Sequence, residues 1–380
     1  MKKTASFIGL GIIAAALALF LWTRQSTNAG TVKIGIILPL SGSMAEYGQN
    51  AKDGLTLAAE ELAKRSNIKK IELVYQDTKD APQDTVNAVR RLIDVDGVHF
   101  IIGGLTSSGV LAAKPYVEQR GVLLFSPAAS APGIPDGKFV FRNWPADDSM
   151  SRQFGDVIYR RGIRKVAILY VSNDYGNTNA NGFASAFESL GGTVSFRRAF
   201  AQGTTDFRSL VTQLSGLQGI ERVLVVAYPD EYRAFFQELA KSPVKPSTIL
   251  TYDTFYSPEL VKEIGGLTEG VVCAVAAKPG DGYAPRLAFV KAYEGRFKNQ
   301  NGSPKEPGLV SDTAYDALIL VATSISKTDG RPSAAAGYLL HSIKDYPGAA
   351  GITNFTSSGD IKGSLALYEV RAGSFVPLGL

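Results

Sequence analysis

The stretch VKIGIIL at residues 32–38 decides the class of fold, because it is apolar at nearly every position. A strand with one face in water would alternate apolar and polar residues, whereas a strand covered on both faces is apolar throughout. Further β-branched runs follow at residues 71–76, 99–103, 122–125, 165–171, 193–200, 222–228 and 269–276. Between them, apolar residues recur at helical spacing, as at Ala51, Leu55, Ala58 and Leu62. This pattern predicts an α/β protein with parallel sheets and right-handed crossovers.

The series of strands divides into two halves. After FRNWPADDSM (141–150) a second series of strands begins, so we predict two Rossmann-like lobes of comparable size. Helical patterns then take over from residue 286 to residue 343, and GDIKGSLALYEV (359–370) returns to a strand pattern. Because these helices come without a complete new sheet, we expect the chain to return and finish the first lobe, which creates a multi-strand hinge.

The predicted organisation has three parts. Residues 1–30 form a signal peptide or an N-terminal anchor. The first lobe combines residues 31–148 with residues 277–363. The second lobe combines residues 149–276 with residues 364–380.

The N-terminus has the order of a secretory signal. Lys2 and Lys3 precede an uncharged run of 16 residues from Phe7 to Trp22, and small polar residues follow up to Ala29. The run is shorter than the roughly 20 residues that a spanning helix needs, which favours cleavage near Ala29 over an uncleaved anchor. Both alternatives predict export of the remaining chain across a membrane.

Charge and cysteine content exclude several classes of protein. Residues 31–380 carry 37 basic and 35 acidic residues, so the calculated pI of about 9.0 is no evidence for nucleic-acid binding. Cys273 is the only cysteine, which rules out an intrachain disulfide. No cysteine follows the apolar run directly, which argues against a lipid-anchored lipoprotein.

The residues needed for most catalytic or metal sites are missing. His99 and His341 are the only histidines, and their positions in a strand and on a helix favour structural roles. The chain has no HExxH, CxxC, Walker GxxxxGK[ST] or GxSxG motif. We therefore expect no catalytic residue, no metal and no cofactor, and a hydrolase is the least supported alternative.

Two loops favour binding of a small polar molecule. FSPAASAP (125–132) follows an apolar run and contains no charged side chain. Its small residues leave backbone N–H and C=O groups uncovered, so they can bind a ligand. The alternative is a simple turn, because Pro and Ser are ordinary turn residues. IGGLTSSG (102–109) resembles a Gly-rich turn into a helix but has no phosphate-binding lysine. With Ser107 or Ser108 in its first turn, this helix N-terminus suits a small anion such as a carboxylate, and simple capping is the alternative.

Several motifs occur together in the order of a known family. They are IGIILPLSGSMAEYGQNAKDGLTLAAEEL, IIGGLTSSG, VLLFSPAASAP, VSNDYGNTNANGFASAF and TTDFRSLVTQL. From about Val32 to its end, the chain resembles the periplasmic branched-chain amino-acid binding proteins of ABC importers. The resemblance implies the type I periplasmic binding protein fold, which is shared with the ligand-binding regions of amino-acid sensing receptors, and a ligand held between two lobes at the carboxyl ends of parallel strands.

The resemblance also implies roles for first-lobe residues. Ser107 matches the serine whose hydroxyl and N–H hold the α-carboxylate of the ligand. Ala128 matches the position whose carbonyl accepts the α-ammonium, and Ser130 matches a threonine that contacts both charged groups. The backbone around Ala129 then faces the ligand, and Tyr47 matches an aromatic wall.

In the second lobe, Tyr175 and Tyr228 match aromatic contacts that close over the ligand. Asp253, after the strand TIL, falls where amino-acid binders place a glutamate against the ammonium. Aspartate is one methylene shorter than glutamate, so closer approach of the lobes or a bridging water is needed. The alternatives are a turn or cap role for Asp253 and core roles for the two tyrosines.

Two further points limit the assignment of the ligand. Ser130 lacks the methyl group of the family's threonine, which loosens packing more than hydrogen bonding. The ligand side chain depends on loop residues such as Trp144, Tyr252 and Phe255, whose directions the sequence does not define.

These patterns predict an exported solute receptor that closes by a hinge motion. Its partners are a small molecule, most simply an amino acid, and the membrane subunits of an ABC permease. A ligand-sensing receptor of the same fold and a binder of amides or aromatic acids are the alternatives.

Overall fold

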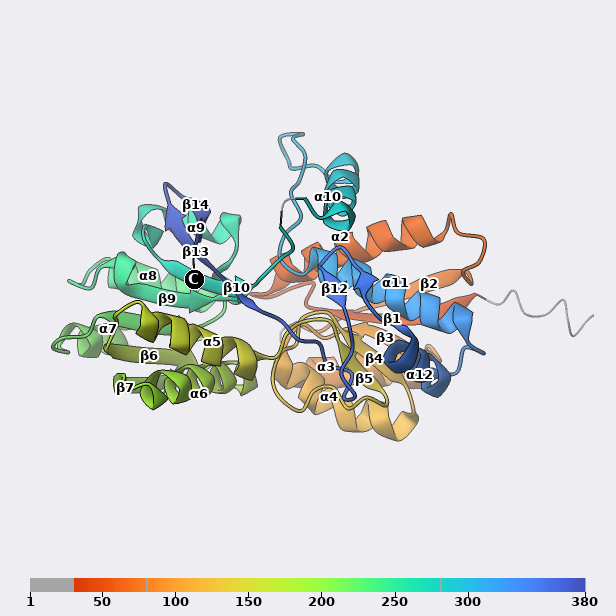
Figure 1. The fold of residues 1–380 in the computed structure, drawn as a ribbon, viewed down its shortest axis with the longest axis horizontal. Helices are drawn as coiled ribbons and strands as arrows, with labels where there is room; N and C mark the ends of the chain where they lie inside the picture. The colour runs from red at the N-terminus through yellow and green to blue at the C-terminus, as the bar shows by residue number, and fades with distance from the viewer. Residues whose placement is uncertain (1–30, 80, 281, 380) are drawn as a thin grey trace, which may run out of the picture.

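The computed structural model describes residues 31–79, 81–280 and 282–379, and it consists of two α/β lobes side by side (Figure 1). The predicted signal peptide or anchor at residues 1–30 lies outside the described residues. Among the residues that are described, no helix is long and apolar enough to cross a membrane.

The first lobe is built on a five-stranded sheet in the order β2-β1-β3-β4-β5, with every neighbouring pair parallel. Its strands are β1 (Val32–Leu38), β2 (Ile71–Asp77), β3 (Phe100–Gly103), β4 (Leu123–Ser126) and β5 (Val140–Arg142). Three helices connect them: α2 (Ala45–Leu62), α3 (Pro82–Asp94) and α4 (Ser107–Arg120).

Successive residues of β1 explain why its sequence is apolar throughout. Ile36 belongs to a core cluster with Leu55 of α2, whereas its neighbour Ile37 packs in a separate cluster with Val89 of α3 and Val110 of α4. Side chains of a strand alternate between faces, so a strand that is covered on both faces must be apolar at every position.

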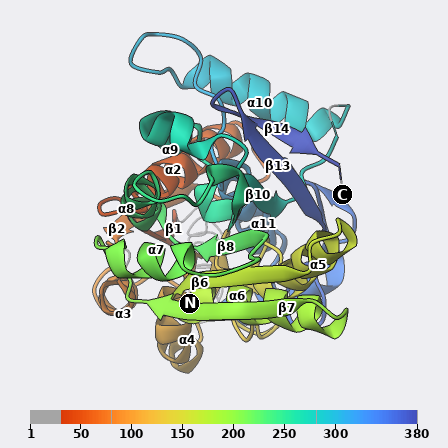
Figure 2. The same ribbon diagram turned by 90° about the vertical axis from the view of Figure 1, so that its left-hand side faces the viewer.

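The second lobe holds a seven-stranded sheet in the order β14-β13-β10-β9-β8-β6-β7. The strands β6 (Lys165–Val171), β7 (Thr193–Phe200), β8 (Arg222–Val226), β9 (Ile249–Tyr252) and β10 (Val272–Ala276) run parallel. The strands β13 (Leu365–Arg371) and β14 (Ser374–Leu378) extend the sheet antiparallel, and the end-on view in Figure 2 shows the resulting twisted array.

The helices of the second lobe are α5 (Asp147–Arg160), α6 (Asp174–Ser189), α7 (Arg208–Ser215), α8 (Pro229–Leu239) and α9 (Pro258–Ile264). The short 3₁₀ helices η1 (Pro246–Thr248), η2 (Asp253–Phe255) and η3 (Gly265–Thr268) lie around β9 and α9.

After β10 the chain returns to the first lobe. There α11 (Ser311–Lys327) packs on α2 and on α12 (Pro332–Ser342), while α10 (Ala284–Arg296) also contacts α2. A small antiparallel pair, β11 (Tyr346–Pro347) and β12 (Ile352–Thr353), follows before the chain crosses again to β13.

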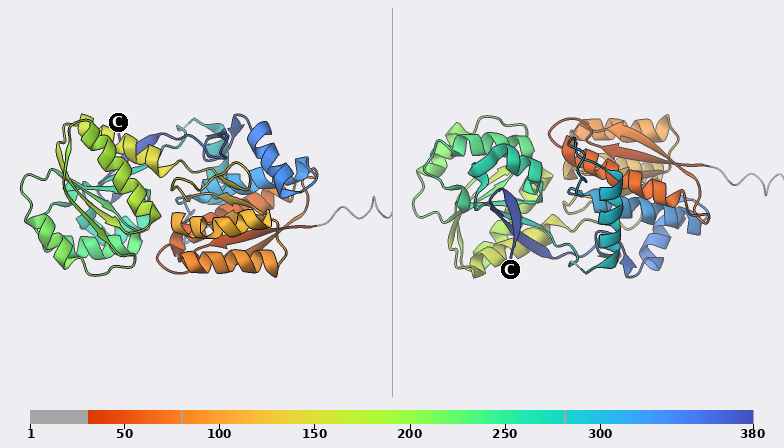
Figure 3. Two further views of the ribbon diagram at one scale, coloured as in Figure 1. Left: turned by 90° about the horizontal axis from the view of Figure 1, so that it is seen from below. Right: turned by 90° about the horizontal axis from the view of Figure 1, so that it is seen from above.

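Three segments therefore cross between the lobes: residues 143–146, 277–283 and 354–364 (Figure 3). Arg142, the last residue of β5 before the first crossing, forms an ion pair with Asp360 of the third, with two hydrogen bonds of 2.7 Å. Arg142 is 1% exposed, so its buried guanidinium needs the Asp360 carboxylate as a counter-charge.

The predicted α/β class, with two lobes on mainly parallel sheets and a multi-strand hinge, is confirmed. Several details differ, because β13 and β14 run antiparallel and the short pair β11–β12 was not predicted. The three-residue β5 and the C-terminal β14 were not predicted, and strand structure in the tail begins at Leu365 rather than at residue 359, because residues 359–364 are used for the third crossing. The exact lobe boundaries at residues 148, 276 and 363 remain a proposal.

Candidate functional site

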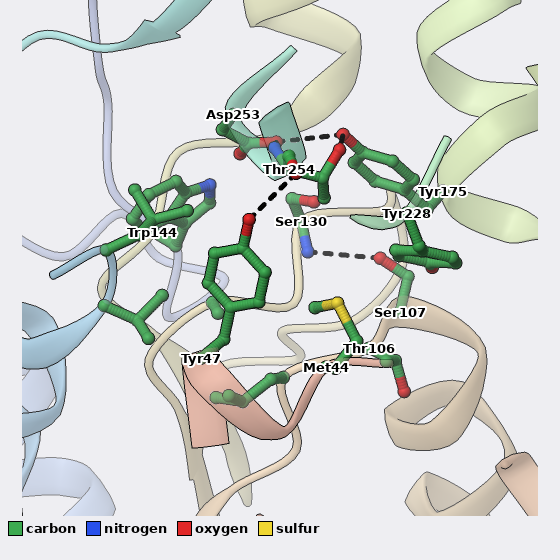
Figure 4. A pocket seen from close by; sticks show the side chains of 14 residues that line it. Met44, Tyr47, Thr106, Ser107, Ser130, Trp144, Tyr175, Tyr228, Asp253 and Thr254 are labelled. Atoms are coloured by element: carbon green, nitrogen blue, oxygen red, sulfur yellow. Dashed lines mark hydrogen bonds between the residues drawn. The ribbon is translucent and has the colours of Figure 1, made fainter. Parts of the chain in front are cut away.

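A pocket lies between the lobes, at the carboxyl ends of the central strands of both sheets (Figure 4). In the first sheet the strand order reverses between β1 and β3, and in the second between β6 and β8, which is where α/β sheets open a binding crevice. The pocket is lined by Met44, Tyr47, Leu105, Thr106, Ser107, Ala128, Ser130, Trp144, Tyr175, Tyr228, Asp253, Thr254, Leu309 and Val310.

The loop after β3 is positioned by two glycines. Gly103 and Gly104 have φ angles of 126° and 74°, which L side chains rarely adopt, and a Cβ on Gly103 would lie 2.0 Å from the carbonyl oxygen of Ile37. This conformation turns the chain into α4 and brings Thr106 and Ser107 to the pocket. The first N–H groups of α4 have no acceptor within the helix, so this end of the pocket attracts negative charge.

Ser107 also holds the loop after β4 in place. Its Oγ accepts hydrogen bonds from the backbone N–H groups of Ser130 and Ala131, at 3.3 and 3.1 Å. The hydroxyl hydrogen of Ser107 is not used in these bonds and is available to a ligand. Among the described residues, no donor reaches the carbonyl oxygen of Ala128, which lines the same pocket.

Ser130 lines the pocket, but its hydroxyl has a protein partner. Ser130 Oγ donates to Asp147 Oδ2 at 2.6 Å, and the Asp147 N–H donates to the Ser130 carbonyl at 2.9 Å. The pKa of Asp147 is raised to about 7, first by burial and then by the nearby Asp253. Asp147 is therefore a second buried carboxyl group, which lies behind the pocket wall and was not predicted.

Asp253 faces the pocket from the second lobe, at the end of β9. Its Oδ1 accepts hydrogen bonds from the Tyr175 hydroxyl at 2.9 Å and from the Thr254 N–H at 2.8 Å. Tyr175 is also stacked on Tyr228, with ring centroids 5.6 Å apart. The structure thus brings these three predicted residues together on one wall (Figure 4).

Burial raises the pKa of Asp253 to about 6, and the hydrogen bonds from Tyr175 and Thr254 limit the rise. No lysine, arginine or histidine lines the pocket. The nearby Arg142 is already paired with Asp360. A buried carboxylate without a counter-charge is costly, so the pocket is suited to a ligand that brings a cation.

The first lobe also contributes an apolar side to the pocket. It is formed by Met44, Leu105, Leu309 and Val310, with Trp144 at the hinge. Val310 has a φ of 65°, which is unusual for a β-branched residue and is typical of strain held at functional sites. Leu309 and Val310 lie in the long connection before α11, and no motif in the sequence indicated them.

The lobes are joined across the pocket by direct hydrogen bonds. The Tyr47 hydroxyl donates to the Thr254 carbonyl at 2.8 Å, and Ser257 Oγ donates to the carboxylate of Glu46 at 3.0 Å. The described conformation is therefore closed. Burial raises the pKa of Glu46 to about 7, against the lowering effect of its hydrogen bond from Ser257, and the carboxylate of Glu259 adds to the rise.

Two predicted residues do not line the pocket. Ser108 lies at the edge of the interface, where its Oγ accepts a hydrogen bond of 3.3 Å from the Asp174 N–H of the other lobe. Ala129 is 1% exposed, and its backbone binds Ser126 Oγ and Arg142 instead. Of the three proposed side-chain walls, Trp144 lines the pocket, while Tyr252 and Phe255 are buried in the core of the second lobe.

The described residues contain no group of three or more His, Cys, Asp or Glu side chains that could hold a metal ion. Cys273 is buried in β10, where burial raises the pKa of its thiol well above the ordinary value. The pocket has hydroxyl and backbone N–H groups at the start of α4 and the Asp253 carboxyl group on the second-lobe wall.

Comparisons with known proteins identify relatives of this chain. A family model described as "Periplasmic binding protein" matches residues 31–374. The leucine-, isoleucine-, valine-, threonine- and alanine-binding protein of Pseudomonas aeruginosa is 27% identical over 375 residues, which cover 95% of each chain.

Solved structures agree with these sequence matches. The leucine-binding protein LivK of Thermotoga maritima superimposes with a TM-score of 0.83 at 26% identity, covering 92% of this chain and 98% of LivK. A solute-binding protein of R. palustris in complex with benzoate has a TM-score of 0.82 over 92% and 96% of the two chains. Its identity is 20%, so this second likeness shows the fold alone.

Proposed function

The chain belongs to the type I periplasmic binding proteins of the branched-chain amino-acid family, a group of solute-binding proteins that are not enzymes, and from this premise we propose that it binds an aliphatic L-amino acid between its lobes. The P. aeruginosa relative is named for binding leucine, isoleucine, valine, threonine and alanine. Members of this family are typically exported receptors, and the same location is part of the proposal for this chain.

The carboxylate of Asp253 is the observation that carries the proposal. It is buried at the pocket wall with Asp147 behind it, and no basic side chain lines the pocket. A ligand with an ammonium group supplies the missing cation, whereas an aromatic or aliphatic acid without one adds a further negative charge.

The other end of the pocket suits the ligand carboxylate. Ser107 offers a hydroxyl hydrogen, and the N-terminus of α4 offers backbone N–H groups. The ammonium then lies between the Ala128 carbonyl and Asp253, and the side chain points to the wall of Met44 and Leu309. An aliphatic side chain fits this wall because burying it releases water from apolar surface on both partners.

A ligand series tests the proposal directly. Leucine, its deaminated analogue 4-methylvalerate and its decarboxylated analogue isopentylamine are titrated in a calorimeter. We expect leucine to bind at least 100-fold more tightly than either analogue, because each analogue leaves one polar end of the pocket unpaired. Equal affinity for leucine and 4-methylvalerate would contradict an ammonium site and favour a binder of simple carboxylates.

We further propose that the closed, loaded form is delivered to an ABC permease. The support is the family itself, because its structurally similar members include substrate-binding proteins of ABC transporters. Deletion of the gene should abolish uptake of labelled leucine at low concentration in the parent cell. Unchanged uptake with a changed transcriptional or behavioural response to leucine would instead identify a sensor.

A further inference from the structure

A second, open cavity lies at the hinge, and we call it the hinge groove. All three crossing segments contribute to it, through residues 143–145, 276–279 and 361–364. Its remaining wall comes from residues 350–353, Tyr283 and Thr313. A groove built from every hinge strand changes shape whenever the angle between the lobes changes.

Two buried polar atoms in this groove have no partner among the described residues. Asn143 is 4% exposed, and its Nδ2 donates to the Thr313 carbonyl at 2.8 Å, but its Oδ1 accepts no hydrogen bond. The hydroxyl oxygen of Tyr283 is also buried and unpaired. Buried polar groups without partners are rare, so a hydrogen-bond donor that reached Asn143 Oδ1 from the groove would satisfy an unpaired acceptor.

The groove is surrounded by an excess of positive charge. Lys278 and Arg286 share a single carboxylate, that of Asp312, at 2.8 and 2.7 Å. Lys362 forms no ion pair with any described residue. The other nearby carboxyl group, Asp316, accepts two backbone N–H groups, and burial raises its pKa to about 7.

Trp144 connects the hinge groove with the pocket between the lobes, because its side chain lines both cavities. The Nζ atom of Lys278, in the groove, lies 5.5 Å from the centroid of the Trp144 ring. A molecule in the groove and a ligand in the pocket therefore share one wall, and both contact the hinge.

We propose that the hinge groove is a second binding site, for a small carboxylate that also carries a hydroxyl group, and that its occupancy is coupled to binding between the lobes. The carboxylate pairs with Lys362, and the hydroxyl donates to Asn143 Oδ1. The apolar part of the molecule packs on Trp144 and Ile361. The site is independent of the proposed function, whereas the coupling rests on it, and the two are tested separately.

The probe for the site is 4-hydroxyphenylacetate, and the protein is the full chain with Trp22→Phe. Trp22 and Trp144 are the only two tryptophans in the sequence, so this variant leaves Trp144 as the only indole. We expect saturable fluorescence changes with 4-hydroxyphenylacetate. Phenylacetate, which lacks the hydroxyl group, and tyrosol, which lacks the carboxylate, should each bind several-fold more weakly.

Variants locate the probe. Lys362→Ala should weaken it by roughly fivefold, because an exposed ion pair is lost, while Lys291→Ala on α10 removes an exposed lysine outside the groove and should change nothing. Normal probe binding in Lys362→Ala would overturn the hinge site. Absence of any saturable signal in the parent protein would overturn it as well.

The coupling has its own measurement. Saturating leucine should change the affinity for the probe, and saturating probe should change the affinity for leucine by the same factor. If neither the probe affinity nor the leucine affinity changes, the coupling is overturned, but the hinge groove remains a binding site for the probe. If leucine itself does not bind, the proposed function fails, while the direct titrations of the probe still decide the hinge site.

Discussion

The two walls of the pocket between the lobes use different chemistry. The first lobe contributes hydroxyl and backbone groups from the loops at Ser107 and Ala128, together with the N-terminus of α4 and no charged side chain. The second lobe contributes a carboxylate, Asp253, supported by the stacked tyrosines Tyr175 and Tyr228.

This difference indicates how the two lobes divide a zwitterionic ligand. Neutral donors at a helix N-terminus hold a carboxylate well even in an open lobe, because backbone groups are already in place there. The buried carboxylate of Asp253 gains its counter-charge only after closure. The first lobe is therefore expected to capture the ligand, and the second lobe to make closure depend on the ammonium group.

The largest expected effect comes from removing the carboxylate of the second lobe. Asp253→Ala should weaken leucine binding by roughly two to three orders of magnitude, because breaking a buried ion pair costs about 3–5 kcal/mol, at about 1.4 kcal/mol per decade. Asp253→Asn should weaken leucine binding to a similar extent, because asparagine keeps the shape of the side chain but not its negative charge. Calorimetric titration measures both.

The matched control for this prediction is Asp230→Ala, which removes an exposed carboxylate of α8 in the same lobe. It should bind leucine as the parent protein does. If Asp253→Ala binds leucine normally, the division of charge between the lobes is wrong.

The second prediction concerns pH. The pKa of Asp253 is about 6, so the carboxylate that neutralises the ammonium is lost as the pH falls through 6, and leucine affinity should drop by up to about tenfold per pH unit below it. Affinity for 4-methylvalerate should not drop, because that ligand has no ammonium group. Calorimetry between pH 8 and pH 5 compares the two slopes, and parallel slopes would contradict the assignment.

The ligand-free protein should show the opposite trend. Glu46 and Asp147 have pKa values raised to about 7 by burial, so their ionisation disfavours the closed, folded state. The stability they contribute is full below their ordinary pKa values near 4 and is lost as the pH rises through 7. The melting temperature without ligand should therefore rise when the pH is lowered from 8 to 5.

A smaller effect is expected on the first-lobe wall. Ser107→Ala removes a hydroxyl that accepts from Ser130 and Ala131 and that can donate to the ligand, so leucine binding should weaken by about tenfold. Ser209→Ala, at an exposed position on α7, is the control. A larger loss in Ser107→Ala than in Asp253→Ala would reverse the assigned roles of the two walls.

The smallest effect should come from the contact that joins the walls. Tyr47→Phe removes the hydroxyl that donates to the Thr254 carbonyl across the interface, which should weaken leucine binding by roughly threefold through a smaller closed population. Tyr116→Phe removes a tyrosine hydroxyl bonded to Asp94 far from the pocket and should have no effect. Small-angle scattering at subsaturating leucine measures the closed fraction, and an unchanged fraction would show that this contact does not stabilise closure.

The resemblance to a known family placed seven residues at the cleft, and all of them line the pocket: Tyr47, Ser107, Ala128, Ser130, Tyr175, Tyr228 and Asp253. Each follows directly after a parallel strand, or lies in the first turn or two of the helix after it, and the carboxyl ends of such strands meet at one edge. Their contacts with a ligand remain predictions.

Some of the residues that were missed, such as Met44 and Thr254, lie beside predicted ones, but others depend on distant parts of the chain. Leu309 and Val310 reach the pocket from the connection before α11, and Asp147 becomes part of it through Ser130. No periodicity or motif marks them, because they are brought to the pocket by the return of the chain to the first lobe. Ser108 was predicted beside Ser107, but consecutive residues of a helix point in different directions, and Ser108 contacts Asp174 instead.

By itself the sequence determined the two α/β lobes and the loops that face the cleft, because strand burial and turn chemistry depend on residues that are close along the chain. Only the tertiary structure decided that Asp253 has no basic neighbour, that Trp144 is shared by two cavities and that three hinge segments enclose a groove. Those properties depend on charged groups and surfaces that are far apart in sequence. Burial changes the free energy of a charged group only when the folded lobes remove it from water.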